Sequence, residues 1–285
     1  MTTSKVSLAL GGGAAKGLAH VGVLRGLEED GVGVAAVAGT SMGSIIGALH
    51  TIGMSGLEME AFFSAVDWSR LARIMVRSVD GSAFHSLLRE TLGSRPIEAI
   101  DLPYAAVCCD LDTGEEVILR SGSLADAVRA SSAIPGVLAP LSIGGRTLVD
   151  GAMVTPVPAN AAKELANAPV LAVNVLKLPA PGEEPTPVVE RFFGGTAPAV
   201  ALQRVETFLH RHRYRFRRRD RDLPNRLGVV ARSFHIMQYH LANLCEQQVP
   251  TVEPEVGAIG WFEFERADEI MEQGYRAYRK NPPRF

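Results

Sequence analysis

The chain has 285 residues with 47% apolar and 21% charged content, which is enough for a substantial core in one large α/β domain or two small ones. Its formal net charge of −2 excludes a global attraction to nucleic acid or membranes, so any such attraction must be local. The three cysteines lack the spacing of a disulfide framework or metal site, and no apolar run has signal or membrane-spanning length, so we expect a cytoplasmic protein with at most peripheral contact at the inner membrane face.

Strands and helices are predicted to alternate at the start of the chain. Residues 5–10 (KVSLAL) form an apolar run that ends in glycines, and residues 17–32 carry apolar side chains at helical spacing. A second buried strand is predicted at 34–40, followed by a helix at 41–53. Because such alternation is typical of a parallel sheet covered on both faces, we expect an α/β three-layer sandwich with a mostly parallel central sheet and helices on both faces.

The rest of the chain is predicted to add further elements to the same unit. They are helical segments at 55–100, 233–248 and 266–278, a helix that runs into a loop at 124–136, a hairpin at 104–119, a strand end with a sharp turn at 148–153, and a buried strand at 170–176. No internal repeat is present, so a single domain over 1–285, with a basic insertion at about 204–226, is the most economical organisation.

The pentapeptide GTSMG, residues 39–43, lies at the junction of the second strand and the second helix. Gly39 and Gly43 remove side chains that would collide where the backbone doubles back, which pushes the Ser41 hydroxyl out of the turn. The amides that follow open a helix whose positive end favours a developing oxyanion. This pattern is typical of a nucleophile elbow, although the motif alone also fits a plain turn of small residues.

The segment LALGGGAAKGLAH, residues 8–20, places glycines between a strand and a helix. Unpaired N–H groups at a helix start point outward, so the segment predicts a cradle for a phosphate or an oxyanion. A P-loop is excluded, because Lys16 is followed by Gly17 and Leu18 instead of Ser or Thr. The dinucleotide fingerprint fits poorly, since counting from Gly11 puts Lys16 at its last glycine position, and a nucleotide-binding βαβ protein is the weaker alternative.

Asp150 is the candidate base, because it ends the apolar segment LVDGAM and Gly151 lets the chain turn away at once. None of the seven histidines follows a strand and an acid in the way of a hydrolase triad, so each is interpreted as a packed or surface residue. Functional groups collect at the carboxyl ends of parallel strands, so we expect residues 11–13, Ser41 and Asp150 to meet there. Alone, an Asp-Gly pair is also a common turn.

Taken together, these motifs resemble those of bacterial patatin-like phospholipases. The glycine loop (residues 11–24), the GTSMG elbow and the Asp-Gly-Ala motif at 150–152 occur in the family's order, and residues 129–140 and 259–277 are similar as well. The resemblance implies a lipid acyl hydrolase with Ser41 as nucleophile, Asp150 as base, and no histidine, metal or cofactor. It implies that the oxyanion donors are the amides of Gly11, Gly12, Gly13 and Ala14, and that the supporting motif residues are Lys16, Gly17, Gly39, Thr40, Met42, Gly43, Gly151 and Ala152.

Ala14 departs from the family pattern, which usually has a third glycine at this position. An alanine still offers its N–H but does not take a positive φ freely, so either the loop is shifted to use Gly11 or the oxyanion site is tuned differently. A catalytically weak or inactive patatin-fold protein with a binding or regulatory role is therefore the alternative. Lys16 is expected to order the loop or to meet an anionic head group.

The segment 204–226 contains nine arginines and three acids. On a helix, one stripe would lie among the arginines, a pattern typical of an interfacial helix drawn to anionic lipid. Its members are Val205, Phe208, Leu209, His212 and Phe216. A solvated insertion or a subunit contact is an equal alternative. The expected partner is a lipid or acyl-ester substrate, and no nucleic acid is expected.

Overall fold

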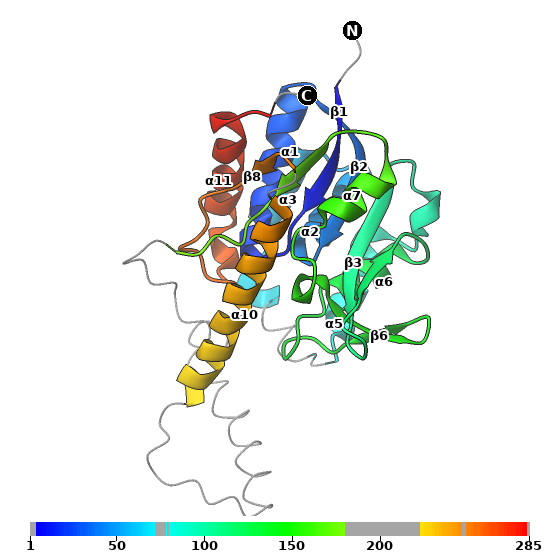
Figure 1. Cartoon of the computed structure of the whole chain (residues 1–285), viewed down its shortest axis with the longest axis vertical. Coiled ribbons are helices and arrows are strands. Elements are labelled where there is room, and N and C mark those ends of the chain that lie inside the picture. The colour runs from blue at the N-terminus through cyan, green and yellow to red at the C-terminus, as the bar shows by residue number, and fades with distance from the viewer. Residues whose placement is uncertain (1–3, 72–77, 79, 180–222, 247–248, 284–285) are drawn as a thin grey trace, which may run out of the picture.

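The computed structural model describes residues 4–71, 78, 80–179, 223–246 and 249–283. Within these residues, eight strands form one sheet (Figure 1). Each strand in the series β5-β6-β3-β2-β1-β7-β8 is hydrogen-bonded to the next, and β4 pairs with the other edge of β3. The strands are β1 (Lys5–Leu10), β2 (Gly33–Thr40), β3 (Tyr104–Asp110), β4 (Glu116–Leu119), β5 (Leu141–Ile143), β6 (Arg146–Asp150), β7 (Val170–Val173) and β8 (Thr251–Val252). The pairs β1–β2, β1–β7, β2–β3 and β7–β8 are parallel, and the pairs that involve β4, β5 or β6 are antiparallel.

Helices connect these strands and flank the sheet. The α-helices are α1 (Ala19–Glu29), α2 (Met42–Thr51), α3 (Gly56–Ser64), α5 (Ser82–Leu92), α6 (Leu124–Ser131), α7 (Ala159–Leu165), α10 (Leu223–Glu246) and α11 (Ala267–Lys280). The short 3-10 helices are η1 (Ala14–Leu18), η2 (Ile97–Ala99), η3 (Gly151–Met153) and η4 (Phe264–Arg266). None of the helices in the described ranges combines the length and the apolar content that crossing a bilayer requires.

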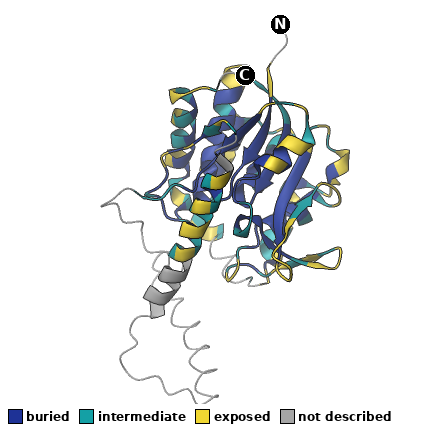
Figure 2. Cartoon of the chain, in the orientation of Figure 1, coloured by how far each residue is buried: buried dark blue, intermediate teal, exposed yellow. Residues whose placement is uncertain are grey.

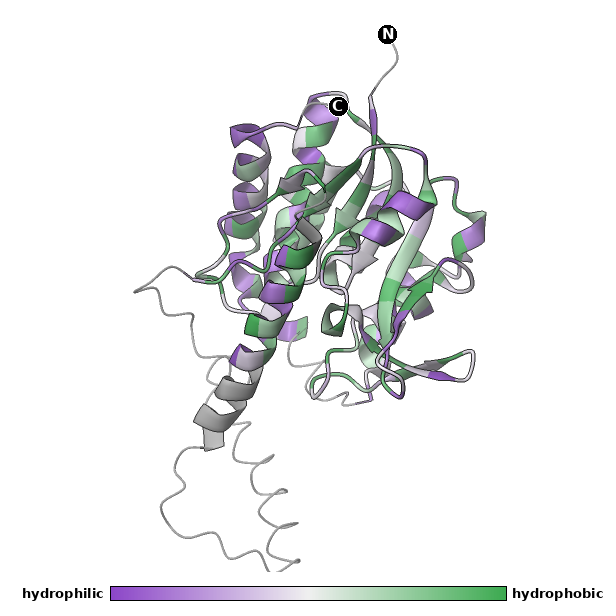
Figure 3. Ribbon diagram, viewed as in Figure 1, coloured by the Kyte–Doolittle hydropathy of each residue, from purple (hydrophilic) through white to green (hydrophobic). Residues whose placement is uncertain are grey.

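The central strands separate two apolar cores, because successive side chains of a strand point to opposite faces. Leu8, Leu10 and Val37 face the larger core, which also contains side chains of α1, α2, α3, α5, α6 and α11. Ala9 and Ala38 face the smaller core beneath α7 and α10. Figure 2 shows the buried sheet between these layers, and Figure 3 shows its strands as predominantly hydrophobic. The predicted three-layer α/β sandwich is therefore confirmed.

Helix α11 closes one side of the larger core by packing along α1 (Figure 1). Glycines allow the two helix backbones to touch: a Cβ on Gly22 would collide with the Met271 carbonyl, and a Cβ on Gly274 with that of Ala19. Beyond this crossing, the Tyr278 hydroxyl donates a hydrogen bond to the Asp30 carboxylate over 2.9 Å.

Residues 124–136 form a helix that ends at Ser131 and runs into a loop, as predicted. Pro135 disfavours helical backbone in the residue before it. The strand that leads to Asp150 is the second arm of a β5–β6 hairpin, which the sequence analysis did not predict. Most of the arginine-dense stretch, residues 204–222, lies outside the described residues.

Candidate active site

Ser41 occupies a strained turn between β2 and α2, with φ 54° and ψ −123°. Such a conformation costs a non-glycine residue about 1–3 kcal/mol and occurs most often at functional sites. A Cβ on Gly39 would collide with the Gly43 carbonyl, and a Cβ on Gly43 would collide with the Leu10 carbonyl. The two glycines therefore permit the tight turn, as the sequence predicted.

Side-chain hydroxyls fix the turn on both sides. The Thr40 hydroxyl donates to the Thr155 carbonyl over 3.0 Å, and thereby joins the end of β2 to the chain that follows Asp150. The Ser44 hydroxyl, in the first turn of α2, donates to the Ser41 carbonyl over 2.7 Å. The first contact fixes the residue before Ser41, and the second fixes the Ser41 carbonyl to the first turn of α2.

Asp150 reaches the site from the opposite direction to Ser41. Ala106 and Val107 of β3 pair with both β2 and β4, so these strands lie on opposite edges of β3. Cys108 and Cys109 pair with both β4 and β6, so β6 shares its edge with β2. The two strands therefore run toward each other along one edge of β3 and meet where Asp150 pairs with Cys108.

Asp150 lies beside the carboxyl end of β2, where it was expected, but its strand β6 is antiparallel to β3 and is not one of the parallel strands. Thr40 pairs with Val107, and Asp150 pairs with the next residue of β3, Cys108. Ser41 and Asp150 are close because a parallel strand and an antiparallel strand end head to head. A Cβ on Gly151 would collide with the Val107 carbonyl, so glycine is required where the chain leaves β6.

The Asp150 carboxyl is buried and hydrogen-bonded, with 4% of the residue exposed. One carboxylate oxygen accepts the Ala152 N–H over 2.9 Å. Burial raises the pKa of Asp150 from 3.8 to about 6, although the nearby Ser41 hydroxyl and the Ala152 amide lower it in part. The carboxyl can therefore exchange a proton near neutral pH.

The glycine loop provides fewer free amides than the sequence predicted. The Gly11 N–H donates to the Val173 carbonyl over 3.0 Å, and the Gly12 N–H donates to the Pro156 carbonyl over 2.9 Å. This corrects the predicted donor set, because these two amides are already engaged. In the part of the chain that the structure describes, the amides of Gly13 and Ala14 have no hydrogen-bond partner.

Ala14 adopts a positive φ of 48°, which an alanine rarely takes. The loop is therefore not shifted to use Gly11, and Ala14 takes a backbone conformation that favours glycine at the expense of local strain. Both Gly13 and Ala14 line the same pocket as Ser41.

Two buried side chains hold this loop from behind. The Nε2 atom of His20 lies 2.7 Å from the Gly11 carbonyl oxygen, and burial lowers its pKa to about 4, so a neutral imidazole donates this bond. The Lys16 ammonium donates to the Lys177 and Gly257 carbonyls, each over 3.3 Å. Lys16 is 1% exposed and burial lowers its pKa to about 7. It therefore orders the loop, and the expected alternative of a head-group contact does not fit its burial.

Gly17 completes the support of the loop. A Cβ on this residue would lie 2.5 Å from the Cβ and Cγ atoms of Met42, the first residue of α2. The absence of a side chain at Gly17 thus allows η1 to touch the start of α2.

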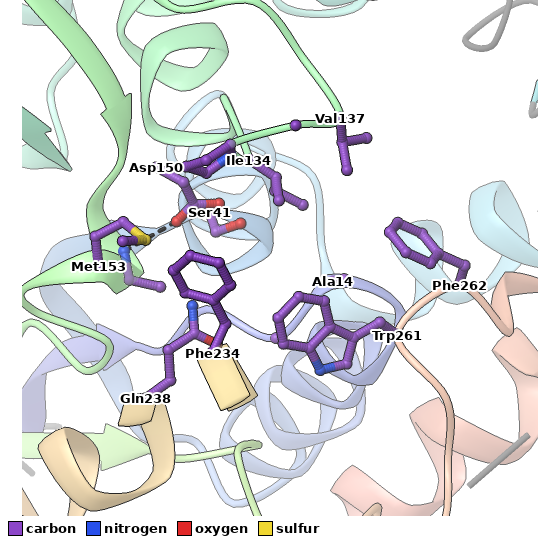
Figure 4. Close-up of a pocket in the computed structure, with 14 residues that line it drawn as sticks. Ala14, Ser41, Ile134, Val137, Asp150, Met153, Phe234, Gln238, Trp261 and Phe262 are labelled. Carbon is purple, nitrogen blue, oxygen red and sulfur yellow. Dashed lines mark hydrogen bonds between the residues drawn. The ribbon is translucent and has the colours of Figure 1, made fainter. Parts of the chain in front are cut away.

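An apolar pocket of about 230 Å³ opens in front of Ser41 and Asp150 (Figure 4). Loop 134–137 and residues of η1 and η3 form part of its wall, and Phe234 and Gln238 of α10 with Trp261 and Phe262 form another part. No histidine lies among the described residues that line it. Five residues that the sequence analysis singled out line this pocket, namely Ser41, Asp150, Gly13, Ala14 and Ala152. The sequence analysis did not predict the lining aromatic residues Phe234, Trp261 and Phe262. The adjacent aromatic pair at 261–262 was the available signal.

Comparisons with known proteins identify the family. Residues 8–163 match the family model described as Patatin-like phospholipase. The uncharacterized NTE family protein Rv1063c of Mycobacterium tuberculosis is 36% identical over 163 residues, which are 55% of this chain and 45% of that protein. The patatin-like phospholipase domain-containing protein ZK370.4 of Caenorhabditis elegans is 30% identical over 291 residues, which are 98% of this chain and 21% of that protein.

The crystal structure of VipD from Legionella pneumophila aligns with a TM-score of 0.46 and 11% identity, over 98% of this chain and 67% of that one. This chain spans less than half the length of the two relatives compared by sequence. Because the family model spans more than half of its residues, the chain belongs to the patatin-like phospholipase family.

Proposed function

We propose that this chain is a lipid acyl hydrolase that cleaves fatty acyl esters with Ser41 as nucleophile and Asp150 as general base. The observation that carries the proposal is that Ser41, on a strained turn, and Asp150, a buried carboxyl whose pKa burial raises to about 6, line the same pocket. Membership of the patatin-like phospholipase family supports a lipid ester as the substrate class.

In the first step, the Ser41 oxygen attacks the ester carbonyl carbon and its proton passes to the Asp150 carboxylate. A serine hydroxyl is a weak nucleophile until a neighbouring group accepts this proton. The pKa of an ordinary aspartate makes it a poor base at neutral pH, whereas a value of about 6 brings Asp150 close to the working range. The strained turn at Ser41 presents the hydroxyl to both the carboxylate and the pocket.

The negative charge on the carbonyl oxygen is proposed to be held by main-chain amides. The unengaged N–H groups of Gly13 and Ala14 border the pocket, and the amide of Met42 follows the nucleophile at the start of α2. A well-placed donor of this kind contributes about 3–4 kcal/mol to transition-state stabilisation.

Protonated Asp150 then returns its proton to the leaving alcohol, and the acyl group remains on Ser41. In the second half-reaction a water molecule attacks the acyl carbon while Asp150 accepts the water proton. Collapse of this intermediate releases the fatty acid, and the proton held by Asp150 returns to the Ser41 oxygen. Asp150 thus acts as base and acid in turn.

The character of the pocket supports an acyl chain as the bound group. Among the described residues that line it, Asp150 is the one charged side chain, and Ile134, Val137, Met153 and Phe234 contribute apolar surface. An alkyl chain gains about 0.8 kcal/mol for each buried CH₂ group. A polar head group is therefore proposed to remain outside this pocket.

Membrane contact through the arginine-dense segment 204–226 remains a separate proposal, based on its composition. Co-sedimentation with vesicles of neutral lipid, and of neutral lipid mixed with an anionic lipid, tests it. Binding to the anionic vesicles that weakens with salt is expected. Equal or absent binding to the two vesicle types would refute this contact.

The hydrolase proposal is tested with a panel of phospholipids and p-nitrophenyl esters. We expect Ser41→Ala and Asp150→Asn to lose ester hydrolysis while remaining folded, whereas Asp112→Asn, a matched change at an exposed turn, keeps wild-type rates. Wild-type turnover by either active-site variant would refute the dyad. Folded wild-type protein that neither hydrolyses the panel nor reacts with a fluorophosphonate at Ser41 would favour the non-catalytic alternative.

A further inference from the structure

Ser131, the last residue of α6, contacts the main chain of the nucleophile. Its hydroxyl accepts the Ser41 N–H over 2.9 Å and donates to the Val107 carbonyl over 2.6 Å. The residue is completely buried, with 0% of its surface exposed. One hydroxyl therefore bridges the first residue after β2 and a residue of the neighbouring strand β3.

The two groups that this hydroxyl joins would otherwise bond to each other. The Val37 N–H of β2 donates to the Pro103 carbonyl over 2.9 Å, beside the start of β3. Bonds of a parallel ladder are evenly spaced along both strands, and Thr40 is still in register with Val107. Continued along both strands, the same series pairs the Ser41 N–H with the Val107 carbonyl.

We propose that Ser131 is a positioning residue whose hydroxyl is inserted into this last rung of the β2–β3 ladder. The insertion separates the end of β2 from β3 at the point where the chain must turn into the elbow. The inference rests on the proposed function, because it assigns Ser131 the task of placing the Ser41 oxygen relative to Asp150 and the amides of the glycine loop.

Removal of the hydroxyl leaves a buried N–H and a buried carbonyl without partners. Such groups are costly, so the main chain has a strong tendency to re-form the direct bond of about 2.9 Å. That closure would draw Ser41 toward β3, and a displacement of about 1 Å at a reacting atom costs about 100-fold in rate. The substrate pocket would keep its walls, since Ser131 is not among its lining residues.

The test measures kcat per active site, with sites counted by fluorophosphonate titration so that misfolded molecules do not contribute. We expect Ser131→Ala to lower kcat per titrated site about 100-fold, with KM and the pH midpoint of the reaction unchanged. Ser132→Ala is the matched control, because this neighbouring buried hydroxyl has no hydrogen-bond partner among the described residues. It is expected to keep the wild-type kcat.

Ser131→Thr and Ser131→Val have nearly the same shape and differ by the hydroxyl, so they decide the question even if the alanine variant is unstable. The threonine variant is expected to retain much more activity per site than the valine variant. Equal kcat in this pair, or an equal loss in Ser132→Ala, would overturn the inference. If Ser41→Ala is inactive and Ser131→Ala turns over normally, only the role of Ser131 is refuted. If Ser41→Ala still turns over substrate, the proposed function itself is refuted.

Discussion

At the level of single residues, the candidate active site is built from groups in unfavourable states. Ser41 and Ala14 have positive φ angles of 54° and 48°, and the Asp150 carboxyl is buried among main-chain groups and apolar side chains. Each state is costly alone and persists only because the surrounding structure enforces it. Changes that relieve such a state should therefore raise stability, and their effects on activity separate the roles of the three residues.

Asp150→Asn is expected to raise the free energy of unfolding above about pH 6 while it abolishes hydrolysis. The pKa of Asp150 is higher in the folded state than its ordinary value, so its stabilising contribution is present below pH 3.8 and is lost as the pH rises through about 6. A shift from 3.8 to about 6 corresponds to about 3 kcal/mol, at roughly 1.4 kcal/mol per pKa unit.

Urea unfolding of the wild type and of Asp150→Asn, measured from about pH 4 to pH 8, checks this expectation. The difference between the two proteins should be small at the acid end and should grow with pH, because asparagine carries no charge to bury. A variant that is less stable than the wild type at pH 8 would contradict the assigned burial of the charge.

Ala14→Gly should stabilise the protein by about 0.5–1 kcal/mol and preserve activity. A left-handed alanine costs about 1–2 kcal/mol, of which part is offset by the larger unfolded-state entropy of glycine. Ala15→Gly, in the adjacent position of η1 without a positive φ, serves as the control and should lower stability. The result would be at variance with the strained loop if both glycine variants lost the same stability.

The roles of single residues could be predicted from the sequence only in part. Ser41 and Asp150 each stand in a short motif with a local physical meaning, so the sequence alone singled out both as candidates. The burial of Lys16 and the bridging contact of Ser131 depend on residues far away in the chain, such as Gly257 and Val107, and no local pattern encodes them. The sequence showed an alanine where the resemblance implies a glycine. It did not show that Ala14 itself would adopt the positive φ.

At the level of elements, the meeting of β2 and β6 along β3 decides where the proposed catalytic groups lie. The register places the end of each strand at neighbouring residues of β3, Val107 and Cys108. Strand order and direction are therefore as important to the site as the two motifs. A substitution that prevents β6 from pairing with β3 at these residues should separate Asp150 from Ser41.

Gly151→Ala is expected to lower both stability and activity, because its Cβ would collide with the Val107 carbonyl of a central strand. Overpacking of this kind costs about 1–3 kcal/mol, and displacement of Asp150 should reduce kcat. Gly33→Ala in β2 is the matched control, since its Cβ would lie 3.1 Å from a flexible Lys5 side chain. Thermal unfolding and ester hydrolysis of both variants give the comparison, and equal effects would argue against a specific docking requirement.

The elements near the amino terminus followed from the sequence because their apolar patterns have clear periods and their turns contain glycine. The direction of β6 did not, since an apolar segment before an Asp-Gly turn reads the same in a parallel or an antiparallel strand. The Gly144-Gly145 pair between Ile143 and Arg146 was the overlooked signal of a two-residue hairpin.

At the level of the whole molecule, the candidate active site includes residues that lie beyond the segment matched by the family model. The model match ends at residue 163, whereas Phe234, Gln238, Trp261 and Phe262 line the pocket from later segments. Helix α11, later still, covers α1 and thereby the element that follows the glycine loop. Residues 223–246 and 249–283 are thus part of the same structure as the motifs.

Gly274→Val should weaken the whole molecule by about 3 kcal/mol or more, because the new side chain would force α11 away from the Ala19 carbonyl of α1. Arg276→Ala, on the exposed side of the same helix, removes a surface ion pair with Glu272 and should change stability by less than about 1 kcal/mol. Urea unfolding measures both. Similar stabilities of the two variants would show that the close helix crossing is not required.

The pH dependence of fluorophosphonate labelling at Ser41 tests the Ser41–Asp150 pair most directly, because labelling reports activation of the nucleophile without the later steps of ester turnover. The rate should fall at low pH with a midpoint of about 6, where the Asp150 carboxylate becomes protonated, and Asp150→Asn should lose most of the rate and this midpoint together. A midpoint that persists in Asp150→Asn would contradict the assignment of Asp150 as the base.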